Sequence, residues 1–143
     1  MRRLAGAYAW SVAHPKMFDD DDPSLEQVRR ICSEFPESDE KVSHGRPAFF
    51  TKKVFAYYGG SLKIDGEWIQ HGRSILVQPD PADRPALLED DRTFVPAYLG
   101  PSGWIGVDLG DGTDWTEVRE LLDASYRLTA PKRAIAELDA SNT

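Results

Sequence analysis

The spacing of apolar residues changes along this chain, and each change marks the start of a different kind of element. Between Asp22 and Pro36 apolar residues recur every three or four positions, the spacing that one buried face of a helix requires. The cap of this helix is either Asp22, with Pro23 at the first helical position, or Ser24, with Gln27 reaching back. The same spacing returns after Asp114, where Glu117 stands three residues on and forms a capping-box pattern. A last short helix is predicted from Pro131 onward.

The central part of the chain has the shorter period that is typical of strands. Asp65-Gly66 is the strongest hairpin signal, and Lys52-Lys53 and Gly59-Gly60 are predicted to be further turns. A short helix is predicted after Pro81, and residues 36–45 are expected to form a loop. The predicted strands are 48–51, 54–58, 61–64, 68–71, 74–78, 97–99 and 104–109.

This order of elements predicts an α+β fold with an antiparallel sheet and helices packed on one face. The length of 143 residues fits one domain, which we place at residues 17–143 with an N-terminal extension over residues 1–16. Arg2 and Arg3 precede a short, mildly apolar stretch that weakly imitates a secretory signal. Its brevity and its polar members favour an extension that is retained.

Composition removes several classes of function. Cys32 is the single cysteine, so an intramolecular disulfide and a cysteine-rich metal site are excluded and a cytoplasmic location is expected. No apolar run reaches the roughly 18–20 residues that a membrane span needs. The three histidines lack metal-ligand spacing, and no phosphate-binding glycine motif is present. Ser43-His44 reads as a structural loop. We therefore expect no catalytic residues, no metal and no cofactor, and a protein that is not an enzyme.

Charge is distributed unevenly, and this keeps one nucleic-acid hypothesis open. The formal net charge is −7, which disfavours a nucleic-acid binder, yet residues 41–84 hold seven basic and four acidic side chains. Basic and aromatic residues interleave across the predicted hairpins, a combination that can bind phosphates and stack bases. The alternative is a solvated surface whose lysines protect sheet edges. The candidate nucleic-acid-binding residues are Arg46, Lys52, Lys53, Lys63, Trp68 and Arg73.

Two smaller charged groups offer other sites. Arg127, Lys132 and Arg133 lie where the last two helices meet, and they form a candidate anion or ligand site unless internal carboxylates neutralise them. The acidic run 19–22 suits the first turn of a helix as a solvated cap. Together with Glu37, Asp39 and Glu40 it also motivates a weaker hypothesis of metal binding.

Several short motifs, in order, resemble the MmcQ/YjbR family. They are SHGRPAF at residues 43–49, KVFA at 53–56, GWIGV at 103–107, DW at 114–115, SYRL at 125–128 and APKR at 130–133. The resemblance covers about residues 24–139, and residues 61–70 look like an extended hairpin relative to the family pattern. It implies a double-wing arrangement with a frataxin-like shape. It also implies DNA binding, a label that the family carries largely by inference from its fold.

These observations lead to one leading hypothesis and two alternatives. The leading one is a non-enzymatic cytoplasmic protein that binds DNA through the basic central hairpins. The first alternative is a module that binds a protein partner or a small ligand through the acidic surface or the groove near Arg127 and Arg133. The weaker one is frataxin-like metal binding on the acidic residues. DNA binding requires the basic residues to converge on one exposed face, whereas a small ligand requires a concave pocket with converging polar groups.

Overall fold

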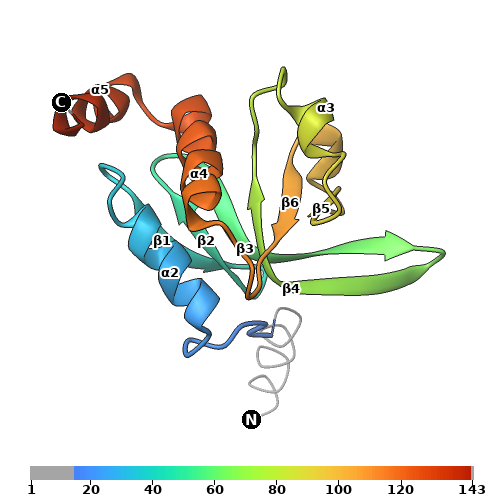
Figure 1. Cartoon of the computed structure of the whole chain (residues 1–143). Coiled ribbons are helices and arrows are strands. Elements are labelled where there is room, and N and C mark those ends of the chain that lie inside the picture. Colours follow the sequence, from blue (N-terminus) through green and yellow to red (C-terminus); the bar gives the residue numbers. More distant parts are fainter. Residues whose placement is uncertain (1–14, 143) are drawn as a thin grey trace, which may run out of the picture.

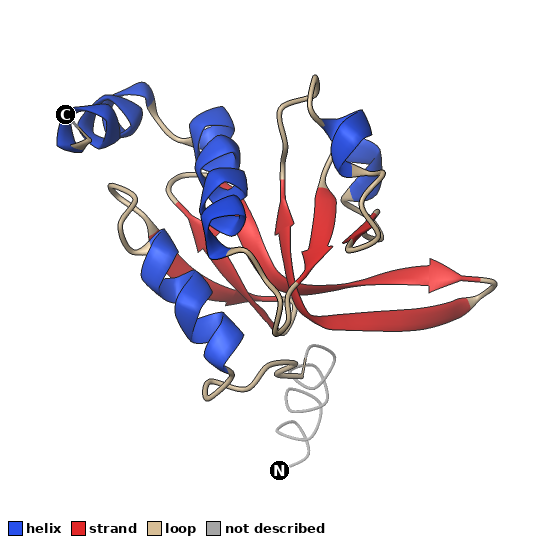
Figure 2. Cartoon of the chain, viewed as in Figure 1, coloured by secondary structure: helices blue, strands red, loops and turns tan. Residues whose placement is uncertain are grey.

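A six-stranded antiparallel sheet, ordered β1-β2-β3-β4-β6-β5, forms the centre of the computed structural model, which describes residues 15–142 (Figures 1 and 2). Residues 1–14 of the predicted extension lie outside this range. The helices are α2 (Pro23–Cys32), α3 (Arg84–Leu87), α4 (Trp115–Thr129) and α5 (Lys132–Ser141), with a 3-10 turn at Gly100–Ser102. The strands are β1 (Asp39–Ser43), β2 (Arg46–Phe50), β3 (Val54–Ile64), β4 (Glu67–Val77), β5 (Thr93–Phe94) and β6 (Ile105–Asp108).

The two main helices begin at the aspartates that the sequence indicated. Asp22 caps α2 by accepting a hydrogen bond from the Ser24 backbone at 2.9 Å. Asp114 caps α4 in the same way, accepting from the backbone of the second and third helical residues at 3.0 and 3.3 Å. The capping-box prediction was wrong for Glu117, because its carboxylate accepts a hydrogen bond from Arg92 Nη2 at 3.0 Å instead.

The strands β3 and β4 are each eleven residues long and form a hairpin that projects from the body as a wing (Figure 1). The turn at Asp65-Gly66 is confirmed, because Ile64 pairs with Glu67. The predicted turn at Gly59-Gly60 was wrong: β3 continues through it. Tyr58 pairs with Ile75 and Gly60 pairs with His71, so residues 72–74 of β4 lie opposite Gly59 alone. This unequal number of residues forms a bulge, at which the strand bends but continues.

Two further predictions about strands were wrong. Residues 39–43, expected to be loop, form the edge strand β1, whose largely exposed and charged side chains carry no apolar alternation that would reveal a strand. Residues 97–99, expected to pair with the strand after Trp104, form a tight loop instead. There the Gly100 amide donates to the Pro96 carbonyl at 2.9 Å, and β6 pairs with β4 and β5.

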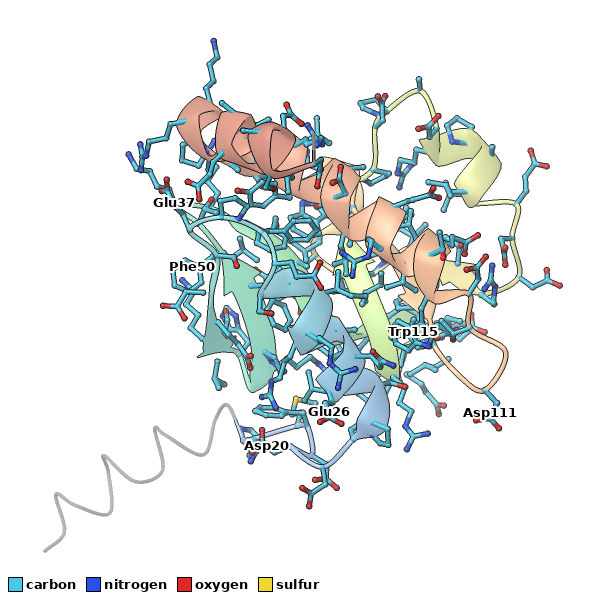
Figure 3. All side chains as sticks on the ribbon, turned by 60° about the vertical axis from the view of Figure 1, so that its left-hand side comes forward. Asp20, Glu26, Glu37, Phe50, Asp111 and Trp115 are labelled. Atoms are coloured by element: carbon cyan, nitrogen blue, oxygen red, sulfur yellow. The ribbon has the colours of Figure 1, made fainter. Side chains whose placement is uncertain are left out.

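The main core lies between the sheet and the helices α2, α4 and α5, as the prediction of helices on one face required (Figure 3). Its centre is aromatic. The Tyr126 ring stacks on Phe35 with 4.9 Å between centroids and meets Phe55 edge-on at 5.4 Å. Such pairs stabilise a core beyond the area that they bury. The YjbR-like motif SYRL thus places its tyrosine at the middle of the fold.

The opposite face of the sheet has a thinner cover. Strand alternation sends Ile75 and Val77 toward the helices and Leu76 to the other side. There Leu76 packs with Phe94 of β5 and with Trp104, which ends the segment that joins β5 to β6. Because that segment carries a loop in place of a long helix, the sheet on this side is incompletely covered.

Ser125 joins α4 to the sheet, and replacing it tests that connection. Its buried hydroxyl donates to the Phe55 carbonyl at 2.5 Å and accepts from the Gln78 amide at 2.9 Å. Ser125→Ala leaves both backbone groups without this partner, so we expect the free energy of unfolding to fall by about 1–3 kcal/mol. Urea denaturation followed by circular dichroism measures the change. The exposed Thr116→Ala change in the same helix should stay within about 0.5 kcal/mol of wild type.

Candidate ligand-binding pocket

A pocket of about 620 Å³ opens on the face of the sheet opposite the main helices. Cavities of roughly 300–1,000 Å³ are the size that binds small molecules. The sheet supplies Tyr57 and Leu76 from β3 and β4, and the loop after β5 supplies its other wall. Residues Met17, Ser43 and His44 form the rim on the side of the β1–β2 turn. The sequence stretches that meet here are far apart along the chain.

Arg46 is the charged side chain of this pocket. It begins β2 and is half-buried, with its Nη2 donating to the Gln70 side-chain oxygen at 2.5 Å. Burial lowers the pKa of Arg46 below the ordinary arginine value. A guanidinium keeps its proton under such conditions, so the pocket contains a partly desolvated positive charge.

Gly59 makes room for that guanidinium. A Cβ atom at Gly59 would lie 2.4 Å from Arg46 Nη1, and the residue has φ +83°, which favours glycine. The Gly59-Gly60 pair therefore has a structural role other than the predicted turn. It lets the β3 backbone approach the arginine and deepens the pocket beside the Leu76 side chain.

Other polar groups surround the arginine. The pocket includes Ser43, Tyr57 and Ser61, whose hydroxyls can donate or accept hydrogen bonds. Burial raises the pKa of the Tyr57 phenol, which keeps that hydroxyl in its neutral, donating form. The remaining lining is largely apolar and includes Pro96 and Leu99. A positive charge, neutral hydroxyls and an apolar wall are the elements of a site for an amphipathic anion.

The loop at residues 96–99 is attached to the sheet where the wing begins. The Ala97 amide donates to the Ser61 carbonyl at 2.9 Å. The next residue, Tyr98, extends its ring into solvent and contacts Trp68 of the wing, with 5.8 Å between ring centroids. Trp68 in turn lies beneath the Lys63 ammonium group, 5.6 Å from it.

The predicted nucleic-acid-binding residues are dispersed over the molecule. Lys52 and Lys53 lie at the turn before β3, and Lys63 lies near the other end of that strand, on the order of 30 Å away at about 3.3 Å per residue. Arg73 reaches toward the N-cap of α2, where its Nε lies 3.7 Å from Asp22. The wing tip carries acidic groups at Asp65 and Glu67 beside Lys63 and Trp68. Arg46 lies in the pocket.

The second basic group is neutralised in part by internal carboxylates. Arg127 contacts Asp123 at 2.6 Å and Asp139 at 2.8 Å, and Arg133 contacts Glu37 at 2.8 Å. Lys132 is exposed at the start of α5. The internal carboxylates that were expected as an alternative are thus present, and they pair with two of the three cations, Arg127 and Arg133.

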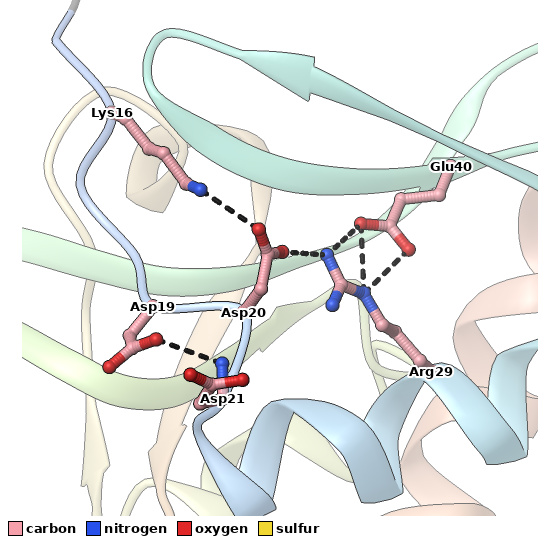
Figure 4. A network of polar contacts seen from close by, with 6 residues as sticks. All are labelled: Lys16, Asp19, Asp20, Asp21, Arg29 and Glu40. Atoms are coloured by element: carbon pink, nitrogen blue, oxygen red, sulfur yellow. Dashed lines mark hydrogen bonds and ion pairs between the residues drawn. The ribbon is translucent and has the colours of Figure 1, made fainter.

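The acidic residues are engaged in structural contacts. Asp20 pairs with Lys16 and Arg29, and Glu40 accepts from both Nε and Nη2 of Arg29 (Figure 4). Glu37 pairs with Arg133, and Asp39 accepts from the backbone of the next residue at 2.8 Å. Among residues 15–142 no group of three histidine, cysteine or acidic side chains is arranged to hold a metal ion.

Two residues that carry nucleophilic atoms, Ser43 and Cys32, lie in structural settings. Ser43 Oγ lies 3.2 Å from His44 Nδ1 at the pocket rim, within the turn that Gly45 completes. Cys32 is buried on the inner face of α2, and burial strongly raises the pKa of its thiol. A thiol in that state reacts slowly because the thiolate is the nucleophile.

Sequence reasoning missed several residues of the pocket. Tyr98 drew no attention because it was expected within a strand, and Tyr57 was counted with the aromatics of the basic hairpins. A usable signal was present at Tyr98, since Pro96 and the Gly100-Pro101 pair bracket it and favour a tight loop. The convergence of these residues on Arg46 depends on long-range pairing that no local pattern encodes.

Comparison with known proteins identifies the family. The chain is similar to the crystal structure of Deinococcus radiodurans protein DR2400, whose domain is described as DUF419. The TM-score is 0.58 and the sequence identity is 21%, and the match covers 80% of this chain and 87% of that one. At that identity the likeness establishes the fold. No match was found among curated proteins. No helix among residues 15–142 is long and apolar enough to cross a membrane. The family model described as YjbR matches residues 33–128, more than half of the chain, and the protein therefore belongs to the YjbR family, as its motifs indicated.

Proposed function

We propose that this protein is a non-enzymatic binding module whose pocket takes a small anionic ligand with an apolar body. The observation that carries the proposal is the half-buried guanidinium of Arg46 in a largely apolar pocket. Small-ligand binding was the second hypothesis from the sequence, expected near Arg127 and Arg133, and the proposal moves it to the pocket at Arg46. It rests on a concave site with converging polar groups, the feature that separates a ligand module from a DNA-binding surface.

The contrast with the other arginines strengthens this reading. Within residues 15–142 every arginine except Arg46 and Arg84 has a carboxylate oxygen within 4.0 Å. Arg84 donates to the Gly103 carbonyl at 3.0 Å, which leaves Arg46 with the neutral Gln70 amide. A partly desolvated cation without a counterion is stabilised when an anion binds, because charge-assisted bonds are about twice as strong as neutral ones.

The dispersion of the basic residues supports this choice over DNA. A duplex bound at one end of β3 would contact Lys52 and Lys53 but not Lys63, given the length of the strand. A duplex bound at the wing tip would meet the carboxylates of Asp65 and Glu67 as well as Lys63. Either pose offers few phosphate contacts, and such contacts dominate the affinity of proteins for DNA.

The proposal is tested with two probes of equal chain length, hexyl phosphate and 1-hexanol, titrated into the full chain and followed by amide chemical shifts. Hexyl phosphate should bind more tightly than 1-hexanol and shift the amides of Tyr57, Gly59 and Ser61. Arg46→Gln should weaken hexyl phosphate about 10- to 100-fold, which corresponds to the roughly 1.5–3 kcal/mol of a hydrogen bond to a charged group. Binding of 1-hexanol should change little.

Lys53→Gln is the matched control, because it removes one exposed cation at the β2–β3 turn and should leave hexyl phosphate affinity unaltered. The proposal fails if Arg46→Gln and Lys53→Gln weaken hexyl phosphate equally, since the attraction would then reflect overall charge. It also fails if duplex DNA at physiological salt binds wild type tightly and shifts the lysine-bearing segments but not the pocket.

A further inference from the structure

Tyr98 is the most exposed large apolar residue described, with 83% of its surface accessible. It lines the same pocket as Arg46, at the edge where the loop meets the wing. An exposed aromatic ring beside a pocket contributes little to the core. Its position must therefore be explained by the local backbone or by a ligand.

The backbone does not favour a tyrosine at this position. Tyr98 has φ 66°, in the left-handed region that glycine and asparagine adopt most readily. The loop imposes this conformation, because the Leu99 amide donates to the Ala97 carbonyl at 2.7 Å and the Gly100 amide donates to the Pro96 carbonyl. Strained residues persist where the surrounding structure enforces them, and they cluster at ligand sites.

The neighbours of Tyr98 add a second aromatic surface. Its ring and that of Trp68 are tilted by 30°, and 45% of the Trp68 surface is accessible. Trp68 and Gln70 share one face of β4, and Gln70 is the partner of Arg46. Tyr98 thus lines the pocket together with Arg46, while Trp68 contacts the Tyr98 ring from outside the lining and shares its strand with the Arg46 partner.

We infer that the ligand of this pocket is an aromatic anion: a flat ring that stacks on Tyr98 beside Trp68, joined to a phosphate or carboxylate that Arg46 binds. This inference rests on the proposed function and specifies its ligand class. The ring would be held by stacking, which adds to simple area burial, and the charged group by hydrogen bonds from the guanidinium. Any flat aromatic ring can stack in this way, so the ligand class includes both aromatic carboxylates and nucleotides.

Phenyl phosphate and cyclohexyl phosphate test the inference, because they match in charge and size and differ in the flatness of the ring. We expect wild type to prefer phenyl phosphate by about 3- to 10-fold, the range that stacking supplies. Tyr98→Gly should remove this preference, so that the variant binds phenyl phosphate and cyclohexyl phosphate within about twofold of each other. The same variant should raise Tm by about 2–4 °C, because glycine relieves the left-handed strain.

Two control variants separate stacking from other effects. Tyr98→Phe keeps the ring and should keep the preference for phenyl phosphate. Val95→Ala trims an exposed side chain of the same segment and should also keep it. Adenosine 5′-monophosphate and benzoate distinguish a nucleotide ligand from an aromatic carboxylate. The probe that binds wild type more tightly, and that loses affinity in Tyr98→Gly, identifies the class of the ligand.

The results that would overturn the inference differ from those that would overturn the proposed function. Equal binding of phenyl and cyclohexyl phosphate by wild type, each dependent on Arg46, would refute the aromatic ligand and leave the anion pocket standing. Failure of every phosphate probe to bind would refute both. A Tyr98→Gly variant with lower Tm and unchanged preference would show that the ring serves the fold, and would also refute the inference.

Discussion

Replacing Tyr126 by alanine should lower the free energy of unfolding by about 3–5 kcal/mol, the range seen when a large buried ring is removed. Tyr126 is fully buried, stacks on Phe35 and meets Phe55 edge-on. Its hydroxyl also donates to the Pro36 carbonyl at 2.6 Å, which fixes the chain just after α2. The loss would leave a cavity where two helices and the sheet meet. Urea denaturation followed by circular dichroism measures it.

Tyr126→Phe separates the ring from the hydroxyl in this experiment. It keeps both aromatic contacts and removes one hydrogen bond, so we expect a loss of about 1–2 kcal/mol. If phenylalanine proved as damaging as alanine, the hydroxyl and not the ring would carry the stabilisation. A loss below about 1 kcal/mol for alanine would contradict the position of Tyr126 at the centre of the core.

Gly59→Ala should reduce both stability and ligand binding. The added Cβ would lie 2.4 Å from Arg46 Nη1, and the alanine backbone would have to keep a left-handed φ of +83°. The backbone strain alone costs about 1–2 kcal/mol. The guanidinium can escape the contact only by moving from its position against β3, so we also expect hexyl phosphate affinity to fall at least tenfold.

Gly66→Ala is a matched control for this change. Gly66 has nearly the same φ, +82°, but a Cβ there would meet nothing within 4 Å. The two variants therefore share the backbone strain and differ in the contact with Arg46. Urea denaturation should show that Gly66→Ala loses only the strain energy and that Gly59→Ala loses at least as much, because its Cβ also meets Arg46 and the Gly72 carbonyl oxygen at 3.2 Å. Gly66→Ala should bind hexyl phosphate like wild type. Equal affinities for the two variants would contradict the role assigned to Gly59.

The helices were predictable from sequence because their signals are local. Asp22 and Asp114 cap the two main helices as expected, and the apolar spacing identified their buried faces. The strand β1 was missed because an exposed edge strand needs no apolar alternation. The Gly59-Gly60 pair was misassigned because glycine marks a turn and a bulge equally well, and the pairing partner of β3 decides between them.

The site was only partly predictable for a similar reason. Arg46 was identified as a binding residue, but it was grouped with cations that the fold separates. Its burial beside Gly59 and its proximity to Gln70 depend on the register of β2, β3 and β4. Tyr98 joins the pocket through the bond between Ala97 and Ser61, across a long stretch of sequence. A charge pattern is visible in a short stretch of sequence, whereas the residues of a pocket are brought together only by the fold.

The most direct test of an anion pocket at Arg46 is a crystal structure of the full chain grown with hexyl phosphate. The account predicts phosphate oxygens about 2.7–2.9 Å from the Arg46 guanidinium nitrogens, with the hexyl chain against Leu76 and Leu99. A structure in which the phosphate binds Lys63 on the wing or Lys132 on α5, while the pocket holds no ligand, would contradict it.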